Sequence, residues 1–537
     1  MGRQQSWDAS WDVYAMSTYN TITSLSESLV NENILYAGTD DGLIHTTKDG
    51  GKNWSSIRAE DLPNLPKTSF VNDIKADLHN ENIVYVALDN HKFGDYKPYL
   101  FKSNDGGKSW KSITNGLPDD TLVWRIVQDH VDPNLLFLAT EYGLYFSNNQ
   151  GSDWIKFSNG LPTISIRDLA IQKRENDLVL ATFGRGFYVL DDYSPLRKLN
   201  NQTKNDFILF DIKEALQYNQ IRTGTDSQGS SYFTSKNPPY GAIFSYYLPK
   251  SYTSIKSERI KKERVLNKEN KDVPFLGWEN LDKENEELKS KIILEIRDSN
   301  GSLVDRINGS SRKGINRISW SLSKPIVTGL SSSSRSGRGG YYYDPSLPVK
   351  EGQYTVSLFE VNNGSFNKLT ESKTFNIKKI RKNVLNNPVE SQIDDFIEKL
   401  VSIETESRLV LDEFSKSKKL FANFDRATRY IENIDSKLIK EISNLYDEMN
   451  SIDVLIGGNK SKKEIGEKDN PSFSDRLMFA KRGFYGNSYG PTKHQLESFE
   501  IGVKQWNQMK PKIENFSKSV NAIKARLESL GSPYIID

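Results

Sequence analysis

The chain has 537 residues, enough for about three domains of ordinary size. Its 72 basic and 70 acidic residues leave a formal net charge of +2, which argues against a dedicated nucleic-acid-binding protein, because such proteins need a clustered basic surface. The absence of cysteine excludes disulfides, thiolate metal sites and a cysteine nucleophile. No apolar run reaches about 18 residues, so no membrane span is expected.

A short motif, Ser/Thr-x-Asp-x-Gly-x-x-Trp, recurs three times in the first 200 residues, at 47–54, 103–110 and 147–154. The third copy has Asn149 in place of the aspartate. The aspartate can accept backbone N–H groups and so fix a tight turn, glycine can supply the positive φ angles, and we expect the tryptophan to fold back over apolar surface. We therefore expect a structural role for the motif residues: Thr47, Asp49, Gly51, Trp54, Ser103, Asp105, Gly107, Trp110, Ser147, Gly151 and Trp154.

Short runs rich in β-forming residues surround each copy and repeat with it. They divide the region into four units, at about 20–57, 70–113, 122–157 and 165–192, of which the fourth keeps the strands but lacks the motif. Short strands at this period are typical of propeller blades. Residues 7–16 are expected to add a strand to a preceding blade, so the sequence predicts a partial propeller over residues 1–200.

The motif resembles the Asp-box of bacterial neuraminidase (BNR) repeats, and the chain resembles bacterial sortilin-like proteins and BNR-repeat glycosyl hydrolases. Residues 36–44 and 181–192 read like the blades of that family, and the likeness continues through 237–242 and 314–320. Members of the family are longer at the N-terminus than this chain. The resemblance therefore implies a further set of N-terminal blades as a partner and an extracytoplasmic location, although this chain shows no signal peptide of its own.

Function is expected at the end of the blades opposite the motif. If the strands of a blade are named A to D in chain order, the motif lies between C and D, and the B–C and D–A loops share the other end. An insertion at residues 90–97 makes the second blade long there and is either a recognition loop or a solvated loop. The ligand-binding candidates at this end are Asp40, Asp41, Asp89, His91, Asp95, Tyr96, Arg125, Glu141, Tyr142, Arg167 and Arg185.

Three functions remain open on the sequence. The leading one is non-catalytic binding of a protein or glycan through these loops. A sialidase-like glycoside hydrolase is the first alternative: it needs two carboxylates about 5–10 Å apart, for which Asp89 and Glu141 are the candidates, and arginines that grip a carboxylate, such as Arg125, Arg167 and Arg185. A cell-surface or secretion-associated structural protein is the second. No phosphate-binding loop, Gly-x-Ser-x-Gly or His-Glu-x-x-His motif occurs, so neither a cofactor nor a metal is expected.

Residues 201–385 read as a β-sandwich of the immunoglobulin or fibronectin type, because alternating strands are joined by Gly/Asn turns. A charged insertion at 254–291 is expected to be helical, 298–301 to be a hairpin turn, and 331–340 to be a low-complexity loop followed by the tyrosines 341–343. The expected core residues are Phe244, Tyr246, Ile293, Leu294, Ile318, Trp320, Tyr354 and Val356.

From residue 386 to the C-terminus the apolar residues recur at intervals of three and four, which predicts three amphipathic helices. Thr492 with Gln495 forms a capping box at the start of the last one. Pro511 should kink or split that helix, and Trp506 is expected in its buried stripe. A helical bundle is the simplest interpretation, and a partner-binding coiled coil is the alternative.

Overall fold

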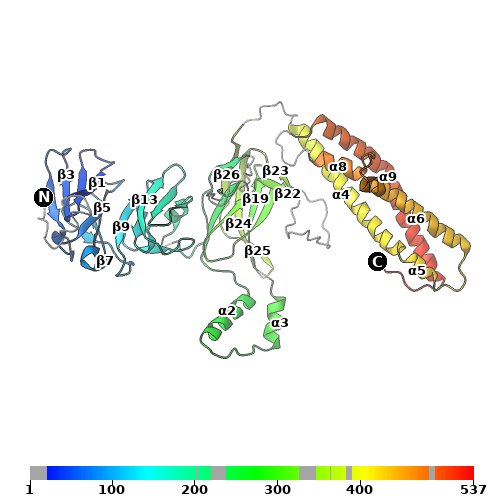
Figure 1. Cartoon of the computed structure of the whole chain (residues 1–537), viewed down its shortest axis with the longest axis horizontal. Coiled ribbons are helices and arrows are strands. Elements are labelled where there is room, and N and C mark those ends of the chain that lie inside the picture. The colour runs from blue at the N-terminus through cyan, green and yellow to red at the C-terminus, as the bar shows by residue number, and fades with distance from the viewer. Residues whose placement is uncertain are drawn as a thin grey trace. The chain divides into compact units, whose positions relative to one another are not determined.

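The computed structural model describes residues 21–200, 203–218, 237–288, 290–325, 346–362, 364–381, 390–482 and 490–536. The chain divides into two compact units, Met1–Phe207 and Ile208–Asp537, and Figure 1 shows the strands and helices of each. Two expected features, the strand at 7–16 and the low-complexity loop with its tyrosines at 331–343, lie outside the described residues. The first unit is all β within its described part, and the second combines β-sheets with a helical C-terminal region.

The described residues of the first unit form four consecutive antiparallel sheets, each of which follows the order of its strands in the chain. Sheet 1 is β1 (Ile22–Glu27), β2 (Leu35–Thr39), β3 (Leu43–Thr47) and β4 (Ser55–Arg58); sheet 2 is β5 (Phe70–Ala76), β6 (Val84–Asn90), β7 (Asp95–Ser103) and β8 (Lys111–Ser112); sheet 3 is β9 (Val123–Gln128), β10 (Leu136–Thr140), β11 (Gly143–Ser147) and β12 (Ile155–Phe157); sheet 4 is β13 (Ile166–Gln172), β14 (Asp177–Thr182) and β15 (Phe187–Leu190). Sheet 4 has three strands where the other sheets have four.

The first strands of neighbouring sheets are joined by side-chain to backbone hydrogen bonds. The Ser24 hydroxyl of β1 accepts from Ile74 N of β5 at 3.0 Å. The Asp73 carboxylate of β5 accepts from Ile126 N of β9 at 3.1 Å. Apolar clusters then fill the space between successive sheets. Successive sheets are therefore packed face to face with their first strands adjacent, as in a propeller.

The motif turns join the third and fourth strands of sheets 1 to 3. In the first turn the Thr47 hydroxyl donates to Asp49 Oδ1 at 2.9 Å and accepts from Gly51 N at 3.0 Å, and Asn53 N donates to Asp49 Oδ1 at 2.9 Å. Gly51 has φ 91°, which few residues other than glycine adopt. The Ser103 and Ser147 turns repeat this network, with Asn149 Oδ1 in the aspartate's place in the third.

The three motif tryptophans differ in burial, contrary to the expectation that each one anchors its turn over apolar surface. Trp154 is 4% exposed and donates to Ile113 O of sheet 2 at 2.7 Å. Trp110 is half-buried against the cluster between sheets 1 and 2. Trp54 is 47% exposed. Trp154 and Trp110 both pack toward the preceding sheet. The burial of a motif tryptophan therefore depends on that sheet and not on the motif alone.

The long connection in sheet 2 is more regular than a loop. β6 extends to Asn90 and β7 begins at Asp95, so that these two residues pair across a single turn of 3-10 helix at His91–Phe93. Half of the expected insertion at 90–97 is therefore an extension of two strands. This places Tyr96 on a strand and leaves only His91 to Gly94 in the turn.

The β part of the second unit is built from two main sheets. A three-stranded sheet orders β16 (Ile208–Leu209), β18 (Ala242–Leu248) and β21 (Gly314–Trp320), and a six-stranded sheet contains β17 (Ala215–Gln217), β26 (Lys373–Lys379), β24 (Gly352–Asn362), β19 (Lys291–Asp298), β20 (Leu303–Gly309) and β25 (Ser365–Lys368). A further pair is formed by β22 (Ser323–Pro325) and β23 (Ser346–Pro348). The Phe244 and Phe375 rings, 5.4 Å apart, connect the two main sheets. The insertion after β18 forms α2 (Ile255–Lys268) and α3 (Trp278–Glu286).

Two of the expected core residues in these sheets are only half-buried, Ile293 on β19 and Ile318 on β21. Ile318 lies on the same face of its strand as the buried Trp320, so its face was predicted correctly. Ile293 is wrong by register, since Ile292 and Leu294 on either side of it are 0% exposed. In a strand a shift by one residue moves a side chain to the other face, so a run of adjacent apolar residues does not reveal which face is inside. The other six expected core residues are buried.

The helical region contains α4 (Glu390–Phe421), α5 (Phe424–Thr428), α6 (Ser436–Gly457), α7 (Lys460–Glu464), α8 (Phe473–Lys481) and α9 (Lys493–Ser529). Three of these are the long amphipathic helices that the spacing predicts, and α9 begins at the Thr492–Gln495 capping box. Trp506 is 0% exposed, and its indole N–H donates to Glu406 Oε2 at 2.9 Å.

The expectation that Pro511 splits the helix is wrong, since α9 continues through that residue. Proline removes one backbone hydrogen bond from the helix. Met509 and Ile513, on either side of it, are 2% and 1% exposed in the core of the region. Apolar packing on both sides therefore holds the helix together where local preference would end it.

Candidate functional site

The two ends of sheets 1 to 4 are distinguished by backbone hydrogen bonds. At one end, each motif turn donates to the connection between the first two strands: Gly50 N to Asn33 O at 3.0 Å, Gly106 N to Asn82 O at 2.8 Å and Gln150 N to Asn134 O at 3.0 Å. At the opposite end, Glu141 N donates to Leu122 O at 3.0 Å and Phe183 N to Ser165 O at 2.9 Å. We call this opposite end, formed by the B–C and D–A connections, the variable end.

Four side chains from sheets 3 and 4 meet at the variable end and form what we call the Trp124 cluster: Trp124, Glu141, Ser165 and Arg167. Glu141 Oε2 accepts from the Trp124 indole N–H at 2.9 Å and from the Ser165 hydroxyl at 2.8 Å, and it lies 3.5 Å from Arg167. The guanidinium of Arg167 stacks 3.8 Å from the Trp124 ring centroid. A cation between a carboxylate and an aromatic ring is held in one orientation by both.

Arg167 is nevertheless accessible, with 43% of its side chain exposed. It also lies 5.4 Å from the ring of Phe183, which is 70% exposed. Tyr142, next to Glu141 in the chain, is 45% exposed. The cluster thus presents a preoriented guanidinium between the buried ring of Trp124 and the exposed ring of Phe183, an arrangement that suits recognition because Arg and aromatic residues dominate binding energy at interfaces.

Sheet 2 adds an Asp–His pair to the same end. Asp89 is 1% exposed, and its Oδ1 accepts from His91 N at 3.1 Å and contacts the His91 ring nitrogen Nδ1. The His91 ring lies edge-on to Trp124, with centroids 5.9 Å apart, which connects the pair to the cluster. Asp89 Oδ2 is buried, and no hydrogen-bond partner for it is found in the described part of the chain. An unsatisfied buried acceptor costs about 1–3 kcal/mol and is uncommon without a reason.

Other candidates have partners that hold the loops together. Thr39 donates to Asp41 Oδ1 at 2.6 Å, and Asp41 is 3% exposed, so this carboxylate belongs to its own turn. Asp40 Oδ1 accepts from Thr21 N at 2.8 Å. Asp95 Oδ2 accepts from the Tyr99 hydroxyl at 2.6 Å, and burial together with this carboxylate raises the pKa of Tyr99.

The three arginines do not share one partner. Arg125 donates to Asn72 O and lies 3.7 Å from Asp168 and 3.8 Å from the buried Asp73. Arg167 pairs with Glu141, and Arg185 is exposed on the turn after Phe183. Burial raises the pKa of Asp73. Each of the first two guanidiniums is thus committed to a different carboxylate, unlike a triad that grips one ligand carboxylate.

Sequence reasoning missed three members of this site as ligand-binding candidates: Trp124, Ser165 and Phe183. Trp124 and Phe183 lie next to or near arginines that were chosen, Arg125 and Arg185, so an aromatic residue close to an arginine on a connecting loop was the available signal. No feature of the sequence singled out Ser165. Tyr96, 55% exposed on β7, has the accessibility that a recognition residue needs.

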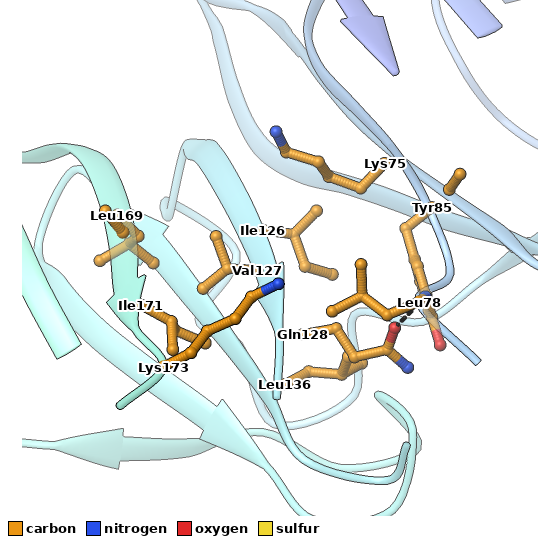
Figure 2. Close-up of a pocket in the computed structure, with 12 residues that line it drawn as sticks. Lys75, Leu78, Tyr85, Ile126, Val127, Gln128, Leu136, Leu169, Ile171 and Lys173 are labelled. Carbon is orange, nitrogen blue, oxygen red and sulfur yellow. Dashed lines mark hydrogen bonds between the residues drawn. The ribbon is translucent and has the colours of Figure 1, made fainter. Parts of the chain in front are cut away.

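A separate pocket of about 220 Å³ lies between sheets 2, 3 and 4. Figure 2 shows its apolar lining, including Ile126, Leu136 and Leu169, with the side chains of Lys75 and Lys173 beside it. Its volume is below the roughly 300–1,000 Å³ of most ligand pockets. The residues that line it include none of the candidates at the variable end.

Two kinds of feature are absent from the described residues. No group of three or more His, Asp or Glu side chains in the ranges given above is placed to hold a metal ion. Within those same ranges, no helix combines the length and the apolar character that a bilayer span requires.

Comparison with known proteins gives solved β-propellers at low similarity. No family model matches the chain, and no curated protein matches it. YCF48 from Cyanidioschyzon merolae is 18% identical over 33% of this chain and 54% of its own, with a TM-score of 0.26. The GH74 enzyme from Niastella koreensis is 13% identical over 43% of this chain and 29% of its own, with a TM-score of 0.26. A structure titled YCF48 bound to D1 peptide matches with 13% identity over 44% of this chain and 67% of its own, at a TM-score of 0.24.

The chain spans about half the length of the first structure that it matches and less than a third of the GH74 enzyme. The neighbours include both a protein with a bound peptide and hydrolases.

Proposed function

We propose that this protein is a non-catalytic binding protein that recognises a protein or glycan ligand through the variable end of sheets 1 to 4. The observation that carries the proposal is Arg167, which is oriented by Glu141 and Trp124, yet is 43% exposed and lies 5.4 Å from the exposed ring of Phe183. Arginine in such a position binds carboxylates and polar ligand groups, and the rings stack on apolar side chains or on sugar faces.

The state of the two candidate carboxylates favours binding over catalysis, because Asp89 is buried and Glu141 is already hydrogen-bonded. A glycoside hydrolase needs both carboxylates to reach the substrate. Asp89 is 1% exposed and engaged with His91, and Glu141 already accepts hydrogen bonds from Trp124 and Ser165. Neither group is free in the way that a nucleophile or a proton donor must be.

The resemblance of the sequence supports the rest of the proposal. Sheets 1 to 4 are consecutive blades of a sortilin-like or BNR-repeat propeller, with the Asp-box turn in sheets 1 to 3, completed by further blades N-terminal to them, in an extracytoplasmic protein. Residues 201–385 form an immunoglobulin- or fibronectin-like sandwich, and residues 386–537 form a helical domain. The contact between Phe244 and Phe375 across two sheets supports the sandwich.

Ligand selection on the purified full chain tests the binding function. A displayed peptide library and a glycan array would be probed with the wild type, Arg167→Ala and Arg174→Ala. Arg174 is 81% exposed and lies between β13 and β14, at the end of the sheets where the motif turns lie, so it is a matched control. Ligands retained by the control and lost by Arg167→Ala support the proposal, and ligands that bind all three proteins equally contradict it.

A panel of fluorogenic glycosides tests the rival activity. Turnover by the wild type that disappears in Asp89→Asn and in Glu141→Gln would replace the binding function with a glycoside hydrolase. A structural role alone predicts neither a selected ligand nor turnover.

A further inference from the structure

The helical insertion after β18 forms a hairpin that a few polar contacts hold together. Arg259 of α2 donates to both carboxylate oxygens of Glu284 on α3, at 2.6 and 2.9 Å, and Ile255 N donates to Glu287 Oε2 at 2.8 Å. These contacts pair a later residue of α2 with an earlier residue of α3, so the two helices are antiparallel arms that meet at a tip (Figure 1). Neither helix contains a buried residue. The hairpin therefore has no core of its own.

The tip of this hairpin exposes large apolar side chains. Phe275 and Trp278 are 67% and 74% exposed, and their ring centroids lie 5.2 Å apart. Leu276 between them is 43% exposed. The tip belongs to the continuously described residues 237–288, far along the chain from either terminus. Apolar side chains exposed next to one another are typical of a surface that a partner covers.

The two helices carry opposite charge. Six basic and two acidic side chains lie on α2, and one basic and four acidic side chains lie on α3. Each helix has a row of three exposed charges spaced by three and four residues, which places each row on one side of its helix. We call these rows the basic edge, formed by Lys261, Arg264 and Lys268, and the acidic edge, formed by Glu279, Asp282 and Glu286. The ion pairs found among the described residues of the hairpin involve none of these six side chains.

Both edges lie on the outer sides of the hairpin. Successive residues are about 100° apart around a helix, which places the basic edge roughly opposite Arg259 and the acidic edge roughly opposite Glu284. Arg259 and Glu284 mark the sides on which α2 and α3 face each other. The two edges therefore face away from the centre of the hairpin, where each can lie beside a helix of opposite charge.

We propose that the hairpins of two copies of the chain stack around a two-fold axis, with their tips together, and form a four-helix bundle. In this arrangement α2 of each copy lies beside α3 of the other, so each basic edge runs along an acidic edge in the opposite chain direction. The Phe275 and Trp278 rings of the two tips then cover one another. The contact is isologous, because the same surface of each copy forms it. Charged residues that flank the packed helices set the orientation of such bundles.

The charges favour a second copy over other partners. A uniformly basic or acidic protein would be attracted by one edge and repelled by the other. A surface of anionic lipids is disfavoured as well, because acidic and basic residues are nearly equal in number over residues 255–288. A second copy supplies both edges at matching spacing. The contact uses no residue of the variable end, so it is independent of the proposed binding function.

Light scattering during size-exclusion chromatography measures the mass of the full chain. The expected result is a dimer of about 122 kDa, twice the 61.2 kDa of one chain. Two triple variants should each give a monomer with an unchanged circular dichroism spectrum: Lys261→Glu with Arg264→Glu and Lys268→Glu, and Glu279→Lys with Asp282→Lys and Glu286→Lys. The matched control reverses three exposed lysines of α9 and should stay dimeric: Lys504→Glu with Lys512→Glu and Lys518→Glu. A monomeric wild type, or a dimer that survives both edge reversals, would overturn the proposal.

A mixture of the two edge variants distinguishes this contact from any other dimer. One variant has acidic edges on both helices and the other has basic edges on both, so each repels its own copy and attracts the other variant. Equal amounts should restore the mass of about 122 kDa, twice the 61.2 kDa of one chain, and a chain with all six reversals should dimerise by itself. Recovery on mixing excludes loss of the fold as the cause of dissociation. If neither the mixture nor the sixfold variant dimerises, the basic and acidic edges do not pair and the proposal is wrong.

Discussion

The two ends of sheets 1 to 4 differ in how their polar side chains and backbone groups are hydrogen-bonded. At the end of the motif turns, each turn satisfies its own polar groups: the side chain of Asp49 or Asp105 accepts from backbone N–H groups three or four residues on. At the variable end, side chains from different sheets satisfy one another, as Glu141 of sheet 3 does with Arg167 of sheet 4. One end is therefore assembled locally and the other only after the sheets have packed.

This difference shows where repetition and function separate. A turn whose polar groups hydrogen-bond with one another can recur from sheet to sheet. Those groups are then not available to bind a ligand. A cluster built between sheets exists once, and it can leave a group such as Arg167 exposed without loss of the turn beneath it. We therefore expect changes at the motif end to act on stability and changes at the variable end to act chiefly on binding.

The largest expected effect is at the motif end, in Trp154→Ala. Removal of a buried tryptophan and of its hydrogen bond to Ile113 O should cost about 3–5 kcal/mol in the free energy of unfolding. Trp110→Ala is the control: its indole is half-buried and bonds to Gly107 O within its own turn, so a smaller loss is expected. Urea unfolding followed by tryptophan fluorescence compares them, and equal losses would contradict packing between sheets as the cause.

A smaller effect is expected at the variable end for Glu141→Ala. The substitution leaves the Trp124 indole N–H and the Ser165 hydroxyl without their acceptor, at a cost of about 1–3 kcal/mol. Glu175→Ala removes the exposed ion pair with Arg174, and a change below about 0.5 kcal/mol is expected. The same urea experiment measures both variants. If they behave alike, the cluster does not hold sheets 3 and 4 together.

The sequence predicts most of the local structure, because turns and strands depend on neighbouring residues. The motif residues 47–54 contain every donor and acceptor of their turn, and the strands around them were expected close to where they lie. Burial was harder to predict. The motif cannot distinguish Trp54 from Trp154, since their exposure is decided by the sheet before each of them.

The sequence predicted which loops form the candidate site, but not which side chains contact one another there. Glu141, Arg167 and Asp41 were all chosen because they lie on these loops. Glu141 and Arg167 do contact each other, whereas Asp41 accepts a hydrogen bond within its own turn. Trp124 joins Glu141 and His91 across two sheets, and no spacing along the chain encodes that contact. Side chains that depend on packing between repeats are visible only in three dimensions.

Acid titration separates the two ends further. The Asn53 backbone N–H, then its side-chain amide and the Thr47 hydroxyl, lower the pKa of Asp49 to about 2, and the Ser109 hydroxyl and backbone N–H lower the pKa of Asp105. A lowered folded-state pKa stabilises the fold above the unfolded value of about 3.9, and the contribution is lost as the pH falls toward the folded value.

Asp49→Asn with Asp105→Asn should therefore flatten the loss of stability between about pH 4 and pH 2. The third turn shows that asparagine fits, since Asn149 Oδ1 accepts from Ser147 at 2.8 Å and from Asp153 N at 3.0 Å. Thermal unfolding at a series of pH values measures the slope. An unchanged slope in the double variant would mean that other carboxylates dominate acid unfolding.

The smallest effect on stability is expected where we expect the largest effect on binding. Tyr142 and Phe183 are 45% and 70% exposed, so Tyr142→Ser and Phe183→Ser should change the free energy of unfolding by less than about 0.5 kcal/mol. Both should weaken a ligand selected on the wild type, measured by calorimetry, because stacking on those rings is lost. Tyr446→Ser, at a residue 55% exposed on α6, removes a similar ring elsewhere and should leave affinity unchanged. If all three substitutions weakened binding equally, the ligand would bind exposed aromatic rings wherever they occur. The variable end would then not be the specific binding site.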